Sequence, residues 1–357
     1  MKFCLPYMMD VPMNNTRKEW IDIAKAIGII LVVFGHLALP VRMVNFIYSF
    51  HVPLFFFLSG MTCSIKRNST VTSFFGKKID SIVVPYFIFS IITYGFWVLI
   101  GRRFGADATY NIEPLKPFLG IFYSSGVDFW MQHNTPLWFL TCLFVTETLF
   151  YFIFMLKRTV VAVVLIAALS ALGFFWVSVN GPRLPWGINI ALCALPIFSA
   201  GYFSKSIFDG LSKKSLICIV ICLCLFVSIV VSSSNGRVDM NYWEYGNVAL
   251  FYVGAFSGVL MVISLSRLIE SNGFLAWVGK NTLVILCLHN LAFTFVRGIM
   301  VYIFHVDLNV FTGAILLNVI FCALSIVMLI PVAIGINNYA PWIVGKKRLL
   351  SPALNPV

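Results

Sequence analysis

The sequence predicts an all-α polytopic membrane protein, a bundle of about ten transmembrane helices with both termini in the cytoplasm. Three observations lead to this fold class. Hydrophobic residues make up 60% of the 357 residues and charged residues 11%, and the mean hydropathy of +0.95 is far above that of soluble proteins. Apolar runs long enough to cross a bilayer recur along the chain. The Lys and Arg residues between these runs fall unequally on the two sides.

Apolar runs of about 20 residues define the predicted spans. These are 21–40, 46–64, 82–100, 136–156, 159–179, 186–204, 215–233, 247–266, 277–300 and 311–336. The predicted organisation is a cytoplasmic N-terminal segment at 1–20, a membrane domain at 21–340 and a cytoplasmic tail at 341–357. With a cytoplasmic N-terminus, 17 Lys and Arg residues lie on the cytoplasmic side and 7 on the other, leaving out Lys25 inside the first span. The excess of positive charge on the cytoplasmic side predicts this orientation.

Composition also bears on the possible partners. The nine Cys residues lie almost entirely inside apolar runs, so we expect buried thiols, with neither a disulfide framework nor a metal site. The net charge of +12 could suggest nucleic acid, but the basic residues are spread through the loops, and membrane orientation explains most of this charge. The first twenty residues lack the pattern of a cleavable signal, so the first span is expected to be retained.

The first span contains two ionisable residues, Lys25 and His36. Eleven residues make about three helical turns, so the two side chains share one face and lie roughly 16 Å apart along the axis. Ionisable residues within a membrane span indicate function. The alternative is a Lys that extends to the interface and a His that only packs against a neighbouring helix.

The second span descends from the outer side and begins with a histidine. His51 and His36 are both predicted roughly 6–8 Å below the outer boundary, so the two imidazoles could share one cavity. Pro53 in the first turns of this span is tolerated there. The alternative for His51 is a histidine at the entry of a helix, without a role in a site.

The cytoplasmic loop after the second span is basic and contains Lys66, Arg67, Lys77 and Lys78. Such a loop is first of all a topology signal. The functional alternative is a platform for a phosphate-rich cytosolic ligand.

Three later segments carry further candidates. The connection 101–135 is long, lies outside and could cover a site. In the span that follows, Trp138 is at the outer interface, where aromatic residues are common, and Glu147 is near mid-membrane, where it must be paired or line a polar cavity. His289 is predicted in the middle of the ninth span, facing the bundle interior.

Five segments together resemble the acyltransferase family 3 of integral membrane acyltransferases, in particular the branch similar to fucose O-acetyltransferases of bacterial surface glycans. In chain order they are IDIAKAIGIILVVFGH, SFHVPLFFFLSG, KKIDSIVVP, PLWFLTCLF and GKNTLVILCLH. The family's hallmark is a basic residue followed, after ten others, by a histidine, which matches Lys25 and His36. Arg is the commoner basic residue there, and Lys lacks its planar fork for bidentate binding.

The resemblance implies an O-acetyltransferase of the bacterial cytoplasmic (inner) membrane. Acetyl-CoA would be the co-substrate on the cytoplasmic side, with no permanently bound cofactor, and the acceptor would be a hydroxyl of O-antigen, capsule, exopolysaccharide or a lipid-linked precursor. An imidazole can take the proton of the attacking hydroxyl or carry the acyl group itself. The predicted site comprises the catalytic His36, the supporting or acceptor-site residues His51, Glu147, Trp138 and His289, and the donor-binding residues Lys25, Lys77 and Lys78.

A secondary transporter is the alternative function, since ionisable residues within the membrane also serve proton coupling. The two halves of the chain show no sequence repeat and no matched pair of Gly- or Pro-broken spans. Both features are typical of transporters, so the sequence favours the acyltransferase.

Overall fold

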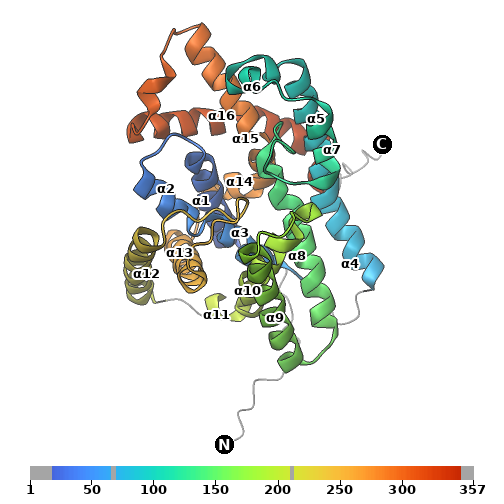
Figure 1. Cartoon of the computed structure of the whole chain (residues 1–357). Coiled ribbons are helices and arrows are strands. Elements are labelled where there is room, and N and C mark those ends of the chain that lie inside the picture. The colour runs from blue at the N-terminus through green and yellow to red at the C-terminus, as the bar shows by residue number, and fades with distance from the viewer. Residues whose placement is uncertain (1–17, 66–69, 210–212, 347–357) are drawn as a thin grey trace, which may run out of the picture.

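The computed structural model describes residues 18–65, 70–209 and 213–346, and this part of the protein is mainly helical (Figure 1). Its α-helices are α1 (Glu19–Gly35), α2 (Val41–Tyr48), α3 (His51–Thr62), α4 (Val71–Lys78), α5 (Val84–Leu99), α6 (Gly105–Tyr110), α7 (Leu115–Tyr123), α8 (Trp138–Met155), α9 (Thr159–Ser178), α10 (Ile188–Phe203), α11 (Lys205–Asp209), α12 (Lys214–Asn235), α13 (Val248–Ile269), α14 (Gly273–Lys280), α15 (Thr282–Tyr302) and α16 (Ile315–Tyr339). Most of the predicted N-terminal segment and C-terminal tail lies outside these residues.

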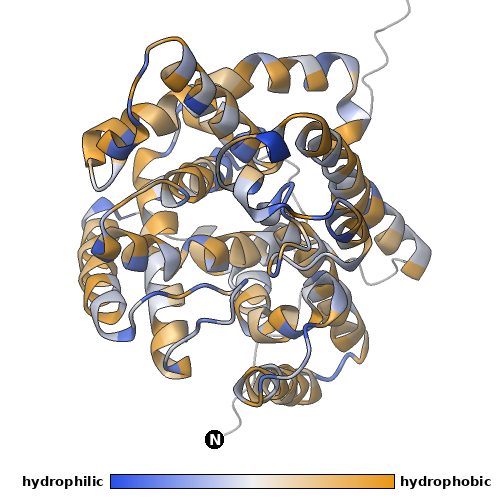
Figure 2. Cartoon of the chain, turned by 45° about the horizontal axis from the view of Figure 1, so that its top comes forward, coloured by the Kyte–Doolittle hydropathy of each residue, from blue (hydrophilic) through white to orange (hydrophobic). Residues whose placement is uncertain are grey.

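The predicted all-α membrane fold is confirmed. Nine segments of the described chain are long and apolar enough to cross a membrane, and α1, with 17 residues, occupies the first predicted span. Figure 2 shows hydrophobic residues along the helices and hydrophilic residues mainly in the connections between them. The cytoplasmic position of both termini stays a prediction.

The second span is broken near its outer end. The helical region starts at Val41, before the predicted residue 46, and Phe50 separates α2 from α3 with φ −141° and ψ −15°. His51 bridges the break, because its Nδ1 lies 2.9 Å from the Ile47 carbonyl oxygen. Pro53 lies in the first turn of α3, where a missing N–H costs no helical hydrogen bond. The break therefore directs His51 into the bundle.

The third span starts earlier than predicted. α4, the π-helical stretch η1 (Ile79–Val83) and α5 follow one another without a break, so the third predicted span, 82–100, is preceded by further helix. Lys77 and Lys78 end α4, and placing them in a loop was wrong. The apolar pattern is weak in α4, which is why the prediction began only at residue 82. A π-helical turn inserts an extra residue and is often found at functional sites.

The ninth span is also divided, into α14 and α15, at Asn281. The Asn281 amide donates to the Trp277 carbonyl, and α14 packs closely on α1. A Cβ atom at Gly279 would lie only 1.8 Å from the Asp22 carbonyl oxygen, so any side chain there would push the helices apart. The resulting arrangement places α1 among α3, α13, α14, α15 and α16 (Figure 1).

Candidate active site

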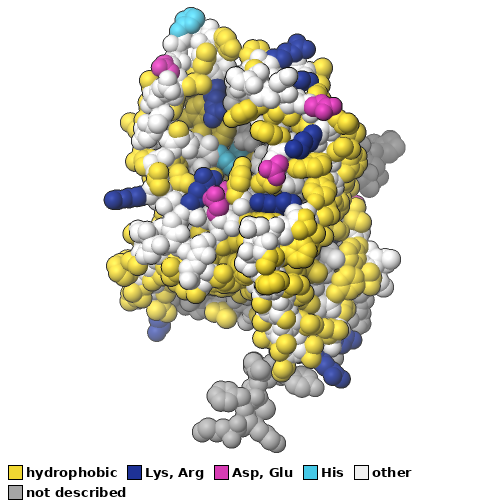
Figure 3. All heavy atoms as spheres, in the orientation of Figure 1, with side chains coloured by type: hydrophobic (Ala, Val, Ile, Leu, Met, Phe, Trp, Pro, Cys, Tyr) yellow, Lys and Arg dark blue, Asp and Glu magenta, His cyan; other side chains and the backbone are white. Residues whose placement is uncertain are grey.

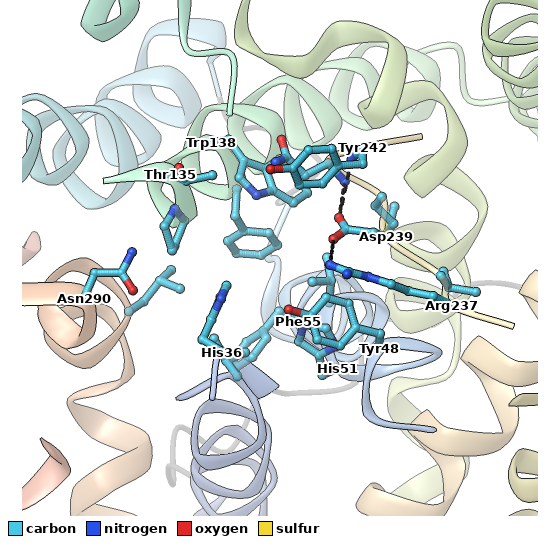
Figure 4. A pocket seen from close by; sticks show the side chains of 18 residues that line it. His36, Tyr48, His51, Phe55, Thr135, Trp138, Arg237, Asp239, Tyr242 and Asn290 are labelled. Atoms are coloured by element: carbon cyan, nitrogen blue, oxygen red, sulfur yellow. Dashed lines mark hydrogen bonds and ion pairs between the residues drawn. The ribbon is translucent and has the colours of Figure 1, made fainter. Parts of the chain in front are cut away.

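A polar cavity of about 320 Å³ lies at the end of α1 (Figure 4). Its walls come from α1, α2, α3, α8, α15, the turn before α8 and the connection between α12 and α13. The lining residues are Val32, His36, Tyr48, His51, Val52, Phe55, Thr135, Pro136, Trp138, Phe139, Arg237, Val238, Asp239, Met240, Asn241, Tyr242, Leu286 and Asn290. Figure 3 shows one face of the molecule hollowed near its centre, with a histidine in the hollow and charged side chains around it.

His36 occupies the C-terminal end of α1, where the helix stops. Its backbone N–H still bonds to the carbonyls of Val32 and Val33, while its side chain is exposed and points into the cavity (Figure 4). Because His36 lies at the end of α1, the helix holds its backbone in place, and no further helical turn follows to cover its imidazole. The ring nitrogens of His36 are therefore accessible to a small molecule in the cavity.

His289 lies directly beside His36. The two ring centroids are 5.2 Å apart, and His289 itself is 0% exposed. Its Nδ1 is 2.8 Å from the Leu286 carbonyl oxygen and 3.1 Å from that of Ile285. Carbonyls only accept, so Nδ1 carries the proton and Nε2 keeps a lone pair. That Nε2 is buried and has no hydrogen-bond partner among the residues that the structure describes.

His51 is fixed in the same tautomer as His289. It donates from Nδ1 to the Ile47 carbonyl, and its ring packs edge-on against Tyr48 at a centroid distance of 4.6 Å. The side chain lines the cavity but is only 5% exposed. The structure thus brings His36, His51 and His289 together from three predicted spans.

The connection 236–247 forms one wall of the cavity, and the sequence analysis did not identify it. Asp239 and Glu244 form a short antiparallel bridge, and Arg237 Nη2 lies 2.8 Å from Asp239 Oδ2. Burial raises the pKa of the Asp239 carboxyl, against the opposing effects of Arg237 and of two backbone N–H groups. The charged and aromatic residues clustered between Asn235 and Asn247 were the signal in the sequence.

Comparison with known proteins identifies the family. A family model described as an acyltransferase domain matches residues 18–335, nearly the whole chain. The chain belongs to acyltransferase family 3. It is therefore a membrane acyltransferase, and the transporter alternative is not supported. No curated protein and no solved structure matches the chain.

In this acyltransferase, Trp138 also belongs to the cavity. It begins α8 and is 7% exposed, so it is largely covered by protein. The long connection that precedes it contributes Thr135 and Pro136 to the same wall. Groups of His, Cys, Asp and Glu able to hold a metal ion are absent from the described residues.

Glu147 lies elsewhere. Its Oε2 is 2.8 Å from Lys78 Nζ, and the two side chains are 4% and 19% exposed. This ion pair joins α8 to the end of α4, and Glu147 does not line the cavity. Lys77 is exposed, and Lys25 is half-buried on α1. The predicted donor-binding residues are thus separate from the histidine cavity.

Proposed function

We propose that this acyltransferase moves an acetyl group from acetyl-CoA to a hydroxyl of a bacterial cell-envelope glycan or its lipid-linked precursor, in the cytoplasmic membrane. The observation that supports this best is His36, an exposed imidazole in a polar cavity, in contact with the buried His289. The predicted orientation supports the proposal too, because it puts the predicted donor-binding lysines on the side from which a cytosolic thioester would enter.

His36 acts as general base. As the acceptor oxygen attacks the thioester carbonyl carbon, an imidazole nitrogen of His36 takes the hydroxyl proton. The carbon–sulfur bond then breaks, and the proton passes from the imidazolium to the departing thiolate. A route through an acetylated imidazole has the same atom balance, with the acetyl group resting on His36 between two half-reactions.

The direct test is the acetylation state of the surface polysaccharide. NMR of glycan from cells that carry the gene should show O-acetyl groups that are missing from cells without it. Membranes containing the protein should move radiolabel from acetyl-CoA, in preference to succinyl-CoA, onto that glycan. Identical glycans from both cell types would contradict the proposal.

His289 is expected to position His36. Replacing His289 by Ala removes the contact at 5.2 Å and leaves His36 free to turn, and a misplacement of about 1 Å costs on the order of 10²-fold in rate. We therefore expect kcat to fall about 10²-fold while KM for acetyl-CoA is unchanged. Thermal stability and the amount of folded protein are measured in parallel. If the amount of folded His289→Ala protein falls as much as kcat does, His289 has a packing role instead.

A further inference from the structure

The connection 236–247 is the part of the cavity that has no role in the chemistry proposed above. Six consecutive residues, 237–242, line the cavity from one side. Figure 4 shows Arg237, Asp239 and Tyr242 on this wall, across from Asn290, with His36 between them. Because this wall faces His36, it can contact the acceptor molecule that carries the reacting hydroxyl.

The charges on this wall disfavour an anionic ligand. Arg237 pairs with Asp239 at 2.8 Å and with Glu244 at 3.6 Å, and its guanidinium lies 4.9 Å from the centre of the Tyr48 ring. The charge of Arg237 is therefore already compensated by two carboxylates. Arg237 is the one Lys or Arg among the described residues that line the cavity, so a carboxylate or phosphate on a ligand finds no uncompensated cation there to offset the cost of its desolvation.

The remaining surface suits an uncharged sugar. Trp138 and Tyr242 provide aromatic rings for the apolar side of a pyranose, and Thr135 and Asn290 offer hydrogen-bonding groups to its hydroxyls. The volume of about 320 Å³ is at the small end of the range for ligand pockets, which fits a single sugar unit better than an oligosaccharide.

The wall is held in place before any ligand arrives. Arg183 stacks on Trp243 at 3.8 Å from the ring centre and donates to the Asn241 carbonyl. The Asn241 amide in turn donates to the Gly126 carbonyl at 3.1 Å. These contacts tie three connections together, and a preorganised wall loses little entropy when it binds.

We propose that the connection 236–247 is the acceptor-recognition element, and that it selects an uncharged glycosyl unit which stacks on Tyr242. This proposal rests on the proposed acetyl transfer. Tyr242 is 52% exposed, so it is open to a partner rather than part of the packed core. Acceptors with a carboxylate or phosphate near the reacting hydroxyl are disfavoured, because Asp239 and Glu244 already compensate the charge of Arg237.

The test uses the purified protein in lipid nanodiscs with radiolabelled acetyl-CoA. The acceptors are the methyl glycosides of a 6-deoxyhexose, a neutral hexose and a hexuronic acid. The wild type should acetylate the neutral glycosides and not the hexuronic acid. Tyr242→Ala should raise KM for the neutral glycosides about tenfold, as expected for the loss of an aromatic contact. Tyr242→Phe retains the ring, so its KM should stay close to that of the wild type. The thermal stability of the three proteins is measured in parallel, so that loss of the aromatic contact is distinguished from loss of the fold.

A charge reversal tests the electrostatic part of the proposal. The Glu244 side chain is 51% exposed, so Glu244→Lys should fold, and it should increase acetylation of the hexuronic acid severalfold relative to the neutral glycosides. Equal use of charged and neutral glycosides by the wild type, or an unchanged KM in Tyr242→Ala, would overturn the recognition role while leaving the acetyl transfer intact. A wild type that consumes no acetyl-CoA would overturn the proposed function, and this proposal with it.

Discussion

Replacing His36 by Ala is expected to abolish detectable acetyl transfer without loss of the protein from the membrane. A positioned general base contributes about 10²–10⁴-fold to the rate. Since the His36 side chain ends in a cavity and not in the packed core, its truncation removes few contacts. The measurement is transfer of radiolabel from acetyl-CoA to the glycan in a deletion background, with membrane abundance determined by immunoblotting.

His51→Ala is the matched control for this experiment. His51 is a histidine of the same cavity, but its Nδ1 is bound to the Ile47 carbonyl and its ring packs on Tyr48. Loss of a supporting side chain should leave partial activity. Normal acetylation with His36→Ala would remove the catalytic assignment, whereas disappearance of the protein would support the packing interpretation of His36.

Hydropathy predicted the long apolar spans and their helical type well, because a bilayer span requires a long apolar run whatever the sequence around it. It did not predict where helices break. The apolar pattern continues through Phe50 and on both sides of Asn281, and these breaks depend on side chains that satisfy freed carbonyls, such as His51 on Ile47. Such bonds join residues four apart and leave no mark in hydropathy.

The histidine cavity was partly predictable. Matching depths in antiparallel spans suggested that His36 and His51 share a cavity, and both line it. The neighbour of Glu147 was not predictable from sequence, because its partner Lys78 is 69 residues away and lies in a helix that the prediction treated as a loop. The wall at 236–247 was missed because a short polar connection between spans has no periodicity to interpret.

Lys78→Ala alone is expected to deplete the protein from the membrane. The substitution leaves Glu147, 4% exposed, as a buried carboxylate without its ammonium partner. Removing one partner of a buried ion pair costs about 3–5 kcal/mol. The combined variant Lys78→Met with Glu147→Gln removes both charges and keeps similar volumes, so its abundance and thermal stability should return close to those of the wild type.

The double variant also separates the two roles of Lys78. If the ammonium additionally binds the donor's phosphates, the restored protein should have a higher KM for acetyl-CoA, and Lys77→Ala, at an exposed neighbouring position, should raise it too. Lys214→Ala is the control, because that side chain is 69% exposed and predicted on the same side of the membrane. A double variant with full stability and an unchanged KM would restrict Lys78 to joining α4 and α8. The donor's phosphates would then have to be held by other cations, and the same measurement on Lys25→Ala would be the next to make.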